Sequence, residues 1–351
     1  MLDYIKKRNG RYWWDYFNLS RKCSYLNLKI NYIKALILYF LHEKIIVIPA
    51  GLLFFLDMII EFFHKTKYYE NRNVLSPKIE SKYETLQILI NSNYSICRFG
   101  DGEFKLIFGQ DIGFQRYTKE LAERLQRILV SSETNILIGI PDKFGVLQAF
   151  NDQTSKFWRK FLSKNRDKIY KLIDFEKQYF CAEVSRPYME EKNKSDSKKF
   201  FNDLKKIWQN KKIILVEGKY SRLGYNNDLF DNAISIKRII CPERDAFNMY
   251  DKILEICKLY EKDNLFILAL GPTATVLAYD LAKDGYRALD LGHIDIEYEW
   301  FLRKTIKKIP IKNKYVNETK HGRIKDDLQD KNFEKEILAD LTQYEKEKLY
   351  D

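Results

Sequence analysis

Short apolar runs and amphipathic stretches alternate along the chain from about residue 76 to residue 304. The apolar runs predict strands at Tyr94–Phe99, Asn135–Ile140, Tyr179–Val184, Lys212–Val216, Ile234–Ile240, Asn264–Leu270 and Arg287–Leu291. Apolar residues at helical spacing predict helices at Lys78–Ile90, Thr118–Val130, Ser155–Tyr170, Lys198–Gln209, Ala246–Tyr260 and Ala274–Lys283. Strands that are regularly separated by helices indicate an α/β fold with a mostly parallel sheet and helices on both faces. Such sheets bind ligands beyond the carboxyl ends of their strands, so the residues after each strand are the candidates for chemistry.

The first 75 residues follow a different pattern. A basic, aromatic start leads into a very apolar stretch, Tyr32–Phe63, with a polar break at residues 42–44. This stretch reaches the roughly 20 apolar residues of a spanning helix only if Asp57 and Glu61 are tolerated inside it. A helix that lies in the membrane interface fits the flanking Lys, Arg, Trp and Tyr residues better. The alternative is a pair of buried helices packed on the main domain.

The chain becomes charged from about Lys304 and ends in a predicted amphipathic helix, Asn332–Leu349. The apolar residues that would share its buried face are Ile337, Leu338, Leu341 and Tyr344. These differences in hydrophobic pattern and charge divide the chain into three parts. We expect a basic, apolar N-terminal segment at 1–75, a main domain at 76–315 and a charged helical tail at 316–351.

Composition and charge narrow the class of partner. The chain has 351 residues, of which 45% are hydrophobic and 31% charged, as in globular proteins, and its net charge of +12 favours anionic partners. Residues 1–34 hold eight Lys or Arg against two acids, so we expect this segment to dock on an anionic membrane surface. No zinc-finger spacing or RNP-like run accompanies the charge, which argues against nucleic acid.

Cysteine usage and the start of the chain indicate a cytoplasmic protein. The five cysteines are dispersed without a CxxC pair, a pattern typical of reduced core thiols. The first apolar run begins only around Ile30, and no small-residue cleavage site follows it, so no signal peptide is predicted. Together with the basic start, this predicts a peripheral location on the inner face of the cell membrane.

The first predicted strand leads into the segment RFGDGE, residues 98–103. Two glycines around an acid indicate a tight turn whose backbone N–H groups can face a ligand. Asp101 and Glu103 offer two carboxylates to Mg²⁺ or Mn²⁺, and Arg98 can pair with a diphosphate. The alternative is an ordinary helix start, in which Glu103 complements the helix dipole.

Two other segments that follow predicted strands can seat a phosphate or a sugar. Gly271, Pro272 and Thr273 open a helix, and the free N–H groups of a helix N-terminus bind phosphate. Ser221 and Arg222 lie in a loop whose hydroxyl, guanidinium and amide groups suit sugar hydroxyls or a diphosphate. Each segment is equally compatible with an ordinary turn.

The segment from Gly292 to Trp300 is the densest cluster of ionisable residues beside a predicted strand end. If a helix starts near His293, then His293, Glu297 and Trp300 share one face, and Asp295 lies on a neighbouring one. An imidazole, a carboxylate and an indole on one face suit base catalysis beside a ring that stacks on a sugar. The alternative is an acidic helix with Trp300 in the core.

Three long segments together resemble the GT-D-type glycosyltransferase family. They are SICRFGDGE, EGKYSRLGYNNDLFDNAISIKRIICPERDAF and LGPTATVLAYDLAKDGYRALDLGHIDIEYEW, and the similarity runs from about Ser76 to Tyr315. Members of this family are bacterial enzymes that transfer hexoses from nucleotide-sugars to surface glycans or glycoproteins. The resemblance implies a Rossmann-like α/β domain, a UDP-sugar donor, a Mn²⁺ or Mg²⁺ ion and a glycan, glycolipid or glycoprotein acceptor.

The resemblance also assigns roles to residues. Asp101 and Glu103 match the family's Asp-x-Glu motif for metal and nucleotide, and residues 98–100 (Arg98, Phe99 and Gly100) lead into it. Residues 271–273 and 292–295 match positions that line the same cleft. Glu297 matches an acidic position suited to a catalytic base, with Asp295 as the second choice.

One loop departs from the family pattern. This chain has Gly-Tyr-Asn-Asn-Asp at residues 224–228, where the resemblance leads us to expect Gly-Val-Gly-Asn-Asp. Tyr225 is much larger than Val, so the donor and acceptor preferences of relatives do not carry over.

The assignments together predict a metal-dependent glycosyltransferase. A cation at residues 101–103, with Arg98 and the helix N-terminus at Thr273, would stabilise charge on the nucleotide diphosphate, while Glu297 accepts a proton from the acceptor hydroxyl. No P-loop, GxGxxG, HExxH or GxSxG motif is present, which argues against an ATPase, dehydrogenase, metalloprotease or α/β-hydrolase. The alternatives are metal-dependent phosphoryl or nucleotidyl transfer and a membrane-docked, non-catalytic scaffold. The sugar, the stereochemistry and the oligomeric state are left open.

Overall fold

The computed structural model describes residues 58–65, 68, 76–324 and 326–342. The chain divides into two units, residues 1–66 and 67–351. Residues 58–65 are helical, whereas residues 1–57, 66–67 and 69–75 of the predicted N-terminal segment lie outside the described residues. Of the helices in the described ranges, none combines the length and the apolar character needed to cross a bilayer.

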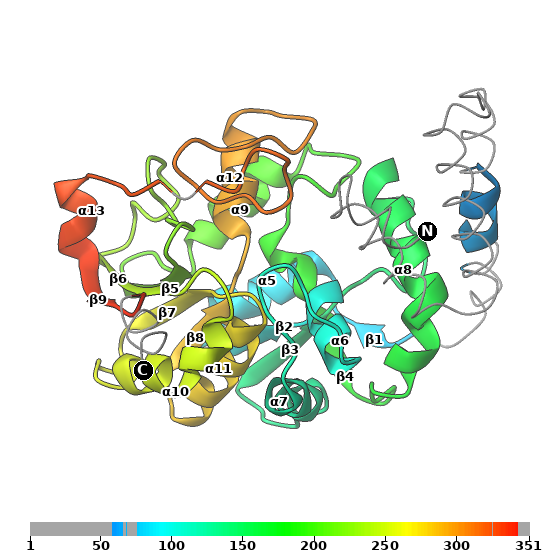
Figure 1. Ribbon diagram of the computed structural model, residues 1–351, viewed down its shortest axis with the longest axis horizontal. Coiled ribbons are helices and arrows are strands. Elements are labelled where there is room, and N and C mark those ends of the chain that lie inside the picture. The colour runs from blue at the N-terminus through cyan, green and yellow to red at the C-terminus, as the bar shows by residue number, and fades with distance from the viewer. Residues whose placement is uncertain (1–57, 66–67, 69–75, 325, 343–351) are drawn as a thin grey trace, which may run out of the picture. The chain divides into compact units, whose positions relative to one another are not determined.

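The second unit is built on a nine-stranded sheet in which all the described strand pairs are parallel (Figure 1). The strands are β1 (Lys78–Ile79), β2 (Ser95–Arg98), β3 (Ile136–Ile140), β4 (Gln178–Cys181), β5 (Lys212–Gly218), β6 (Ser235–Cys241), β7 (Leu265–Ala269), β8 (Arg287–Asp290) and β9 (Ile337–Asp340). Their order across the sheet is β1-β4-β3-β2-β8-β7-β5-β6-β9. The predicted parallel sheet is confirmed, and each predicted strand is present.

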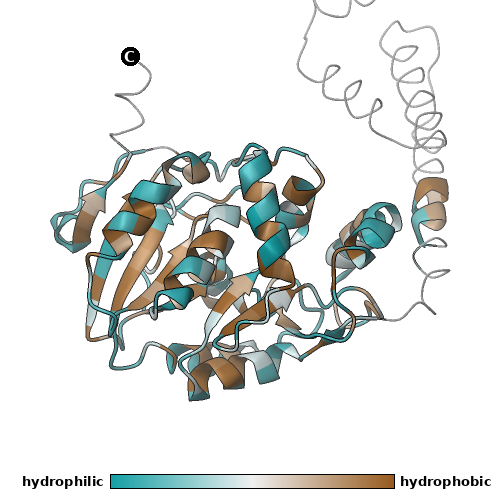
Figure 2. Ribbon diagram, turned by 90° about the horizontal axis from the view of Figure 1, so that it is seen from below, coloured by the Kyte–Doolittle hydropathy of each residue, from teal (hydrophilic) through white to brown (hydrophobic). Residues whose placement is uncertain are grey.

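Helices pack on both faces of this sheet. They are α5 (Lys82–Asn91), α6 (Asp101–Ile107), α7 (Lys119–Leu129), α8 (Asp152–Tyr170), α9 (Ser197–Lys205), α10 (Tyr250–Cys257), α11 (Pro272–Lys283), α12 (Ile294–Leu302) and α13 (Lys331–Glu336), with short 3₁₀ turns η2 (Ala182–Ser185) and η3 (Ala246–Met249). Neighbouring residues of β2 point to opposite faces: Cys97 joins a core with α7, α10 and α11, and Ile96 joins a core with α5, α9 and α12. Figure 2 accordingly shows hydrophobic strands between helices that carry many hydrophilic residues.

A four-residue strand, β8, joins the two halves of the sheet. It pairs with β2 through Leu289 and Ile96 on one side, and with β7 over residues 287–290 on the other. From β2 the chain continues to β3, away from β8, whereas from β8 it continues through α12 to β9 at the far edge. The connections therefore diverge between β2 and β8, and an α/β sheet binds its ligand beyond the strand ends at such a switch point.

The predicted C-terminal helix, Asn332–Leu349, is wrong for residues 337–342. α13 ends at Glu336, and the next four residues form β9, which pairs in parallel with β6. Leu341 is buried, and its backbone N–H donates to Ile240 O at 2.8 Å. The edge of β6 offers backbone partners to an apolar run, and this tertiary pairing outweighs the helical pattern of a short charged segment. Residues 343–351 lie outside the described part of the tail.

The four described cysteines agree with the prediction of reduced core thiols. Cys97, Cys181, Cys241 and Cys257 are buried and form no disulfide. Burial raises the pKa of each of these thiols, so they stay protonated and unreactive. Cys23 lies outside the described residues.

Candidate functional site

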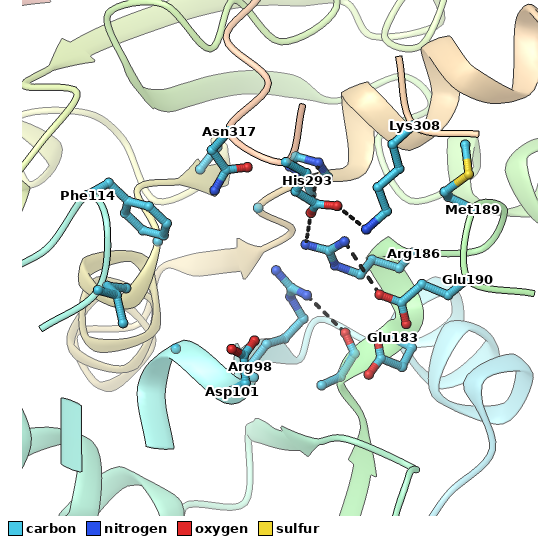
Figure 3. A pocket seen from close by; sticks show the side chains of 18 of the residues that line it. Arg98, Asp101, Phe114, Glu183, Arg186, Met189, Glu190, His293, Lys308 and Asn317 are labelled. Carbon is cyan, nitrogen blue, oxygen red and sulfur yellow. Dashed lines mark hydrogen bonds and ion pairs between the residues drawn. The ribbon is translucent and has the colours of Figure 1, made fainter. Parts of the chain in front are cut away.

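A cavity of about 1150 Å³ opens beyond the carboxyl ends of β2, β4, β5, β7 and β8. Its walls come from the segments that follow these strands, from the N-terminus of α8 and from a loop at residues 306–318. Figure 3 shows Arg98 and Asp101 facing Arg186 across this space, with Glu190 beside it and His293 above. Predicted site residues that line the cavity are Arg98, Phe99, Gly100, Asp101, Glu103, Ser221, Gly271 and His293. Predicted site residues that do not line it are Arg222, Pro272, Thr273, Asp295 and Glu297.

Arg98 is held at the switch point by Asp290, at the end of β8, and by Ala182, which follows β4. Its Nη2 donates to Asp290 Oδ1 at 3.2 Å, and its Nη1 donates to Ala182 O at 2.9 Å. Asp290 also accepts from Thr275 Oγ1 at 3.2 Å. Gly292, just after β8, has a φ of 39°, and a Cβ there would lie 2.6 Å from Arg98 Nη2. The guanidinium is thus held by hydrogen bonds at Nη1 and Nη2 where it lines the cavity.

The Asp-x-Glu turn forms the start of α6. Gly100 N–H donates to Glu103 Oε2 at 2.6 Å and closes the first helical turn, while Asp101 pairs with Lys105 one turn later. Burial raises the pKa of Glu103 to about 7; the negative charges of Asp290 and Asp101 add to this shift, and the Gly100 N–H opposes it. The helix start, one of the two alternatives from the sequence, is present, and both carboxylates of the turn also line the cavity.

The turn at residues 271–273 presents only its glycine to the cavity. Gly271 precedes α11, Pro272 is the first residue of the helix, and Thr273 is fully buried. The Thr273 hydroxyl lies 3.4 Å from Gln115 Oε1, behind the cavity wall. A phosphate at this end of the cavity would therefore meet backbone at Gly271 rather than the threonine side chain.

The two predicted site residues of the loop after β5 lie in different places. Ser221 lines the cavity, whereas Arg222 turns away, and its guanidinium donates to the carbonyl oxygens of Asn313 and Asp326. Tyr225, the residue that departs from the family pattern, also lies outside the cavity: its hydroxyl bonds to Asp330 at 3.2 Å and its ring contacts Phe333. The large side chain at position 225 thus packs against α13 and does not narrow the cavity.

The opposite wall is an ion network around Glu318. Arg186 Nη2 lies 2.9 Å from Glu318 Oε1, and Lys308 pairs with the other carboxylate oxygen. Burial opposes the charge of Glu318, yet the cations, Arg186 first, hold the pKa of this carboxyl well below its usual range. His293 Nε2 lies 3.3 Å from Glu318 Oε1, and burial lowers the pKa of His293 to about 3, so the imidazole is neutral.

Glu297 and Asp295 bind protein loops rather than the cavity. Glu297 Oε2 accepts from the backbone N–H groups of Tyr188 and Met189 at 3.1 and 2.8 Å. Asp295 Oδ1 accepts from Gly224 N–H at 2.9 Å. Both side chains are almost completely buried and neither lines the cavity, so the structure does not bring the predicted catalytic base to the cavity.

Two further contacts hold residues of α12 inside the protein. Asp295 Oδ2 accepts from Lys314 Nζ at 2.6 Å, so this carboxylate is neutralised inside the protein. Trp300 is fully buried, and its indole N–H donates to Ile309 O at 2.9 Å. Trp300 therefore lies in the core, which was the alternative that the sequence left open.

Sequence reasoning missed the segment that follows β4. Arg186 and Glu190 continue the strand predicted at Tyr179–Val184, and both line the cavity. The rule that ligands bind beyond strand ends would have selected them. Lys308 and Glu318, in contrast, come from a loop that follows no strand, and no local sequence signal marks them.

A sequence profile of the family described as the glycosyltransferase GT-D fold matches residues 96–319, a range that contains all the cavity-lining residues above. The glycosyl transferase Gly of Streptococcus gordonii is 38% identical over 261 residues, which cover 74% of this chain and 38% of that protein. The glycosyltransferase GlyD of Streptococcus pneumoniae is 37% identical over 257 residues, which cover 73% of this chain and 31% of that protein. The chain thus spans about a third of the length of these curated relatives.

Solved structures are similar over most of the chain. A domain described as having a distinct glycosyltransferase fold gives a TM-score of 0.73 at 36% identity, covering 80% of this chain and 99% of that one. A glycosyltransferase from Streptococcus sanguinis gives a TM-score of 0.72 at 36% identity, covering 76% of this chain and 100% of that one. These structures therefore resemble this chain over about three quarters or more of its length.

Proposed function

Because this chain belongs to the glycosyltransferase GT-D fold family, we propose that it transfers a hexose from a UDP-sugar to a hydroxyl group of a surface glycan, glycolipid or glycoprotein. The observation that carries the proposal is the cavity at the β2–β8 switch point, where fixed guanidinium groups and an Asp-x-Glu turn face one space. Its volume of about 1150 Å³ suits a ligand larger than a typical drug, as a nucleotide-sugar is.

The donor diphosphate would lie against Arg98 and Gly271. Arg98 uses one N–H of Nη1 and one of Nη2 for contacts within the protein, and each of these nitrogens carries a second N–H. Guanidinium groups bind phosphate oxygens through such paired N–H groups. Gly271 and Ser221 add backbone and hydroxyl groups on the side of β7 and β5.

A divalent cation at the Asp101–Glu103 turn completes the proposed donor site. Among residues 58–65, 68, 76–324 and 326–342, no three His, Cys, Asp or Glu side chains come together as a metal site. The two carboxylates of the turn fit instead the pattern in which Mg²⁺ or Mn²⁺ takes one or two carboxylates and completes its shell with substrate phosphate oxygens. When bound, the ion would supply positive charge to the diphosphate leaving group.

Transfer requires the bond between the anomeric carbon and the diphosphate oxygen to break. The electron pair of that bond leaves with UDP, and Arg98 stabilises the resulting negative charge. The acceptor oxygen bonds to the anomeric carbon and loses its proton to a base. Neither Glu297 nor Asp295 reaches the cavity, and His293 with its lowered pKa is a weak base, so another side chain has to accept this proton.

Replacement of Asp101 by Asn tests the proposed donor site. We expect Mn²⁺-dependent release of UDP from a panel of UDP-hexoses to fall by at least about 10²-fold, the scale of one electrostatic contact to developing charge. Glu120→Gln is the matched control, because Glu120 is also an acid in the first turn of a helix but lies outside the cavity.

Full activity of Asp101→Asn, or of the wild type in EDTA, would exclude the metal. Release of inorganic phosphate in place of UDP would indicate phosphoryl transfer, and nucleotide binding without turnover would indicate a scaffold.

A further inference from the structure

Glu190 is a cavity-lining carboxylate that no hydrogen bond satisfies. Its side chain is 12% exposed, and its Oε2 is buried without a hydrogen-bond partner in the described structure. The nearest cations are Lys143, whose Nζ lies 3.7 Å from Oε2, and Arg186, whose Nη1 lies 3.6 Å from Oε1. Both distances exceed a hydrogen bond, so Glu190 keeps its capacity to accept one from a ligand.

Several other carboxylates of the cavity are engaged in ion pairs, among them Glu183, whose Oε1 lies 3.4 Å from Lys143 Nζ, while Asp152 and Glu243 lie on other segments of the lining. Glu318 and Asp290 are each paired with an arginine of the cavity wall, and Glu191 is paired with a lysine. The two carboxylates of the Asp-x-Glu turn belong to the proposed donor site. A group that already receives strong donors is a poor proton acceptor, and this leaves Glu190 as the best-placed base on the wall that Arg186 occupies.

The groups that surround Glu190 come from four elements. Glu183 lies on η2, Arg186 on the loop that carries Glu190, Lys143 on the segment after β3, and Glu297 on α12. Burial raises the pKa of Glu190 to about 7; the negative charge of Glu183 adds to the shift, and Lys143 and Arg186 oppose it. A carboxyl with a pKa near neutral pH is matched to proton transfer with a hydroxyl group.

Glu190 also lies beside the part of the cavity that is free for an acceptor. Its carbonyl accepts from Asn151 N–H at 3.0 Å, which places it against the N-terminus of α8. This end of α8 contributes polar side chains and Phe157, which is 44% exposed, to the cavity lining. An exposed ring beside polar groups suits a sugar, because the ring packs on C–H groups while the polar groups bind hydroxyls.

We propose that Glu190 is the general base of the transfer, an assignment that rests on the proposed glycosyltransferase function. Its carboxylate takes the proton of the acceptor hydroxyl while the acceptor oxygen bonds to the anomeric carbon. The bond from that carbon to the diphosphate breaks, and its electron pair leaves with UDP. The acceptor then occupies the half of the cavity formed by residues 151–158 and 183–194.

The variant Glu190→Gln tests this role with water as the acceptor. The assay is UDP release from the UDP-hexose that the wild type hydrolyses fastest, and calorimetry measures the affinity for UDP and Mn²⁺. We expect kcat to fall by about 10²–10⁴-fold, the usual scale for loss of a general base, while the affinity for UDP stays unchanged. At saturating Mn²⁺, which would keep the Glu103 carboxyl ionised, the acid limb of the wild-type pH–rate profile should disappear in the variant, because the Glu190 carboxyl has been removed.

Two further variants keep the test decisive. Glu120→Gln, the control outside this cavity, should leave kcat within a few-fold of wild type, while Glu190→Asp should keep the acid limb at a lower kcat. Unchanged turnover in Glu190→Gln, or a parallel loss of UDP affinity, would overturn the assignment. If the proposed function itself is wrong, the wild type will release no UDP from any UDP-hexose, and this result is distinct from those that would overturn the assignment of Glu190.

Discussion

Gly271 has a backbone conformation that residues with a side chain rarely adopt. Its φ is 55° and its ψ is −139°, and a Cβ there would lie 2.4 Å from the ring of Phe114. Two independent requirements, the dihedral angles and the close approach of an aromatic ring, therefore act on one residue of the cavity wall. The turn can present its backbone to a ligand only as long as both are met.

We expect Gly271→Ala to lower the free energy of unfolding by at least about 1–3 kcal/mol, because the backbone strain alone has this size. Thermal or urea unfolding measures the change. Gly113→Ala is the control: Gly113 lines the same cavity, but its φ is ordinary and no atom lies within 4 Å of an added Cβ. In the double variant Gly271→Ala/Phe114→Ala, the destabilisation caused by the clash with the ring should be absent, and the destabilisation caused by backbone strain should remain. Equal stability of the two alanine variants would contradict this account.

Helical periodicity could not identify the residue of α12 that faces the cavity. It placed His293, Glu297 and Trp300 on one face, but only His293, the residue before the first helical turn, lines the cavity. Residues 294–300 are all buried, so the helix has no polar side that would orient it. The Asp-x-Glu turn was easier to predict, since it directly follows a strand and its position depends on no rotation.

At the scale of elements, α13 and β9 seal one edge of the sheet. Arg238 on β6 is 3% exposed; its Nη1 lies 2.5 Å from Glu217 Oε1 on β5, and its Nε lies 2.6 Å from Glu336 Oε2 on α13. The guanidinium also lies 4.4 Å from the ring centre of Phe333. One arginine thus ties two strands to the helix that precedes β9, which fixes the place where β9 pairs.

We expect Leu341→Ala to destabilise the second unit by about 2–5 kcal/mol, the usual cost of removing a buried leucine side chain. Leu341 is 1% exposed and packs in the main core directly after β9. Urea unfolding provides the measurement, and Lys335→Ala, at an exposed position of α13, is the control. A change below about 0.5 kcal/mol would mean that β9 is an appendage and not a part of the cooperative sheet.

The elements that the sequence pattern missed are short. β1 has two residues and β9 has four, and neither shows enough of an apolar run to be separated from the helical pattern beside it. The seven predicted strands are those with neighbours on both sides of the sheet, where burial on both faces leaves a continuous apolar run. Pairing of the edge strands depends on distant partners, which a local pattern does not contain.

For the molecule as a whole, the basic start of the chain leads us to expect docking on an anionic membrane. The full chain should co-float with phosphatidylglycerol vesicles, less so as salt rises, and should not co-float with phosphatidylcholine vesicles. Deletion of residues 1–66 removes the first unit. We expect the remaining chain to stay off the vesicles, and to keep its melting temperature and its hydrolysis of UDP-hexoses. Unfolding of the shortened chain would show that the N-terminal helices belong to the core.

The position of β8 also bears on how the protein is made. Arg98 and Asp290 touch across the centre of the sheet although they are 192 residues apart in the chain. Ribosomes add about 5–20 residues per second, so Arg98 waits roughly 10–40 s for this partner. Near the end of that interval the strands that flank β8, β2 and β7, have both been synthesised without the strand that joins them. Their unpaired edges are the surfaces that a ribosome-associated chaperone would have to shield from other nascent chains.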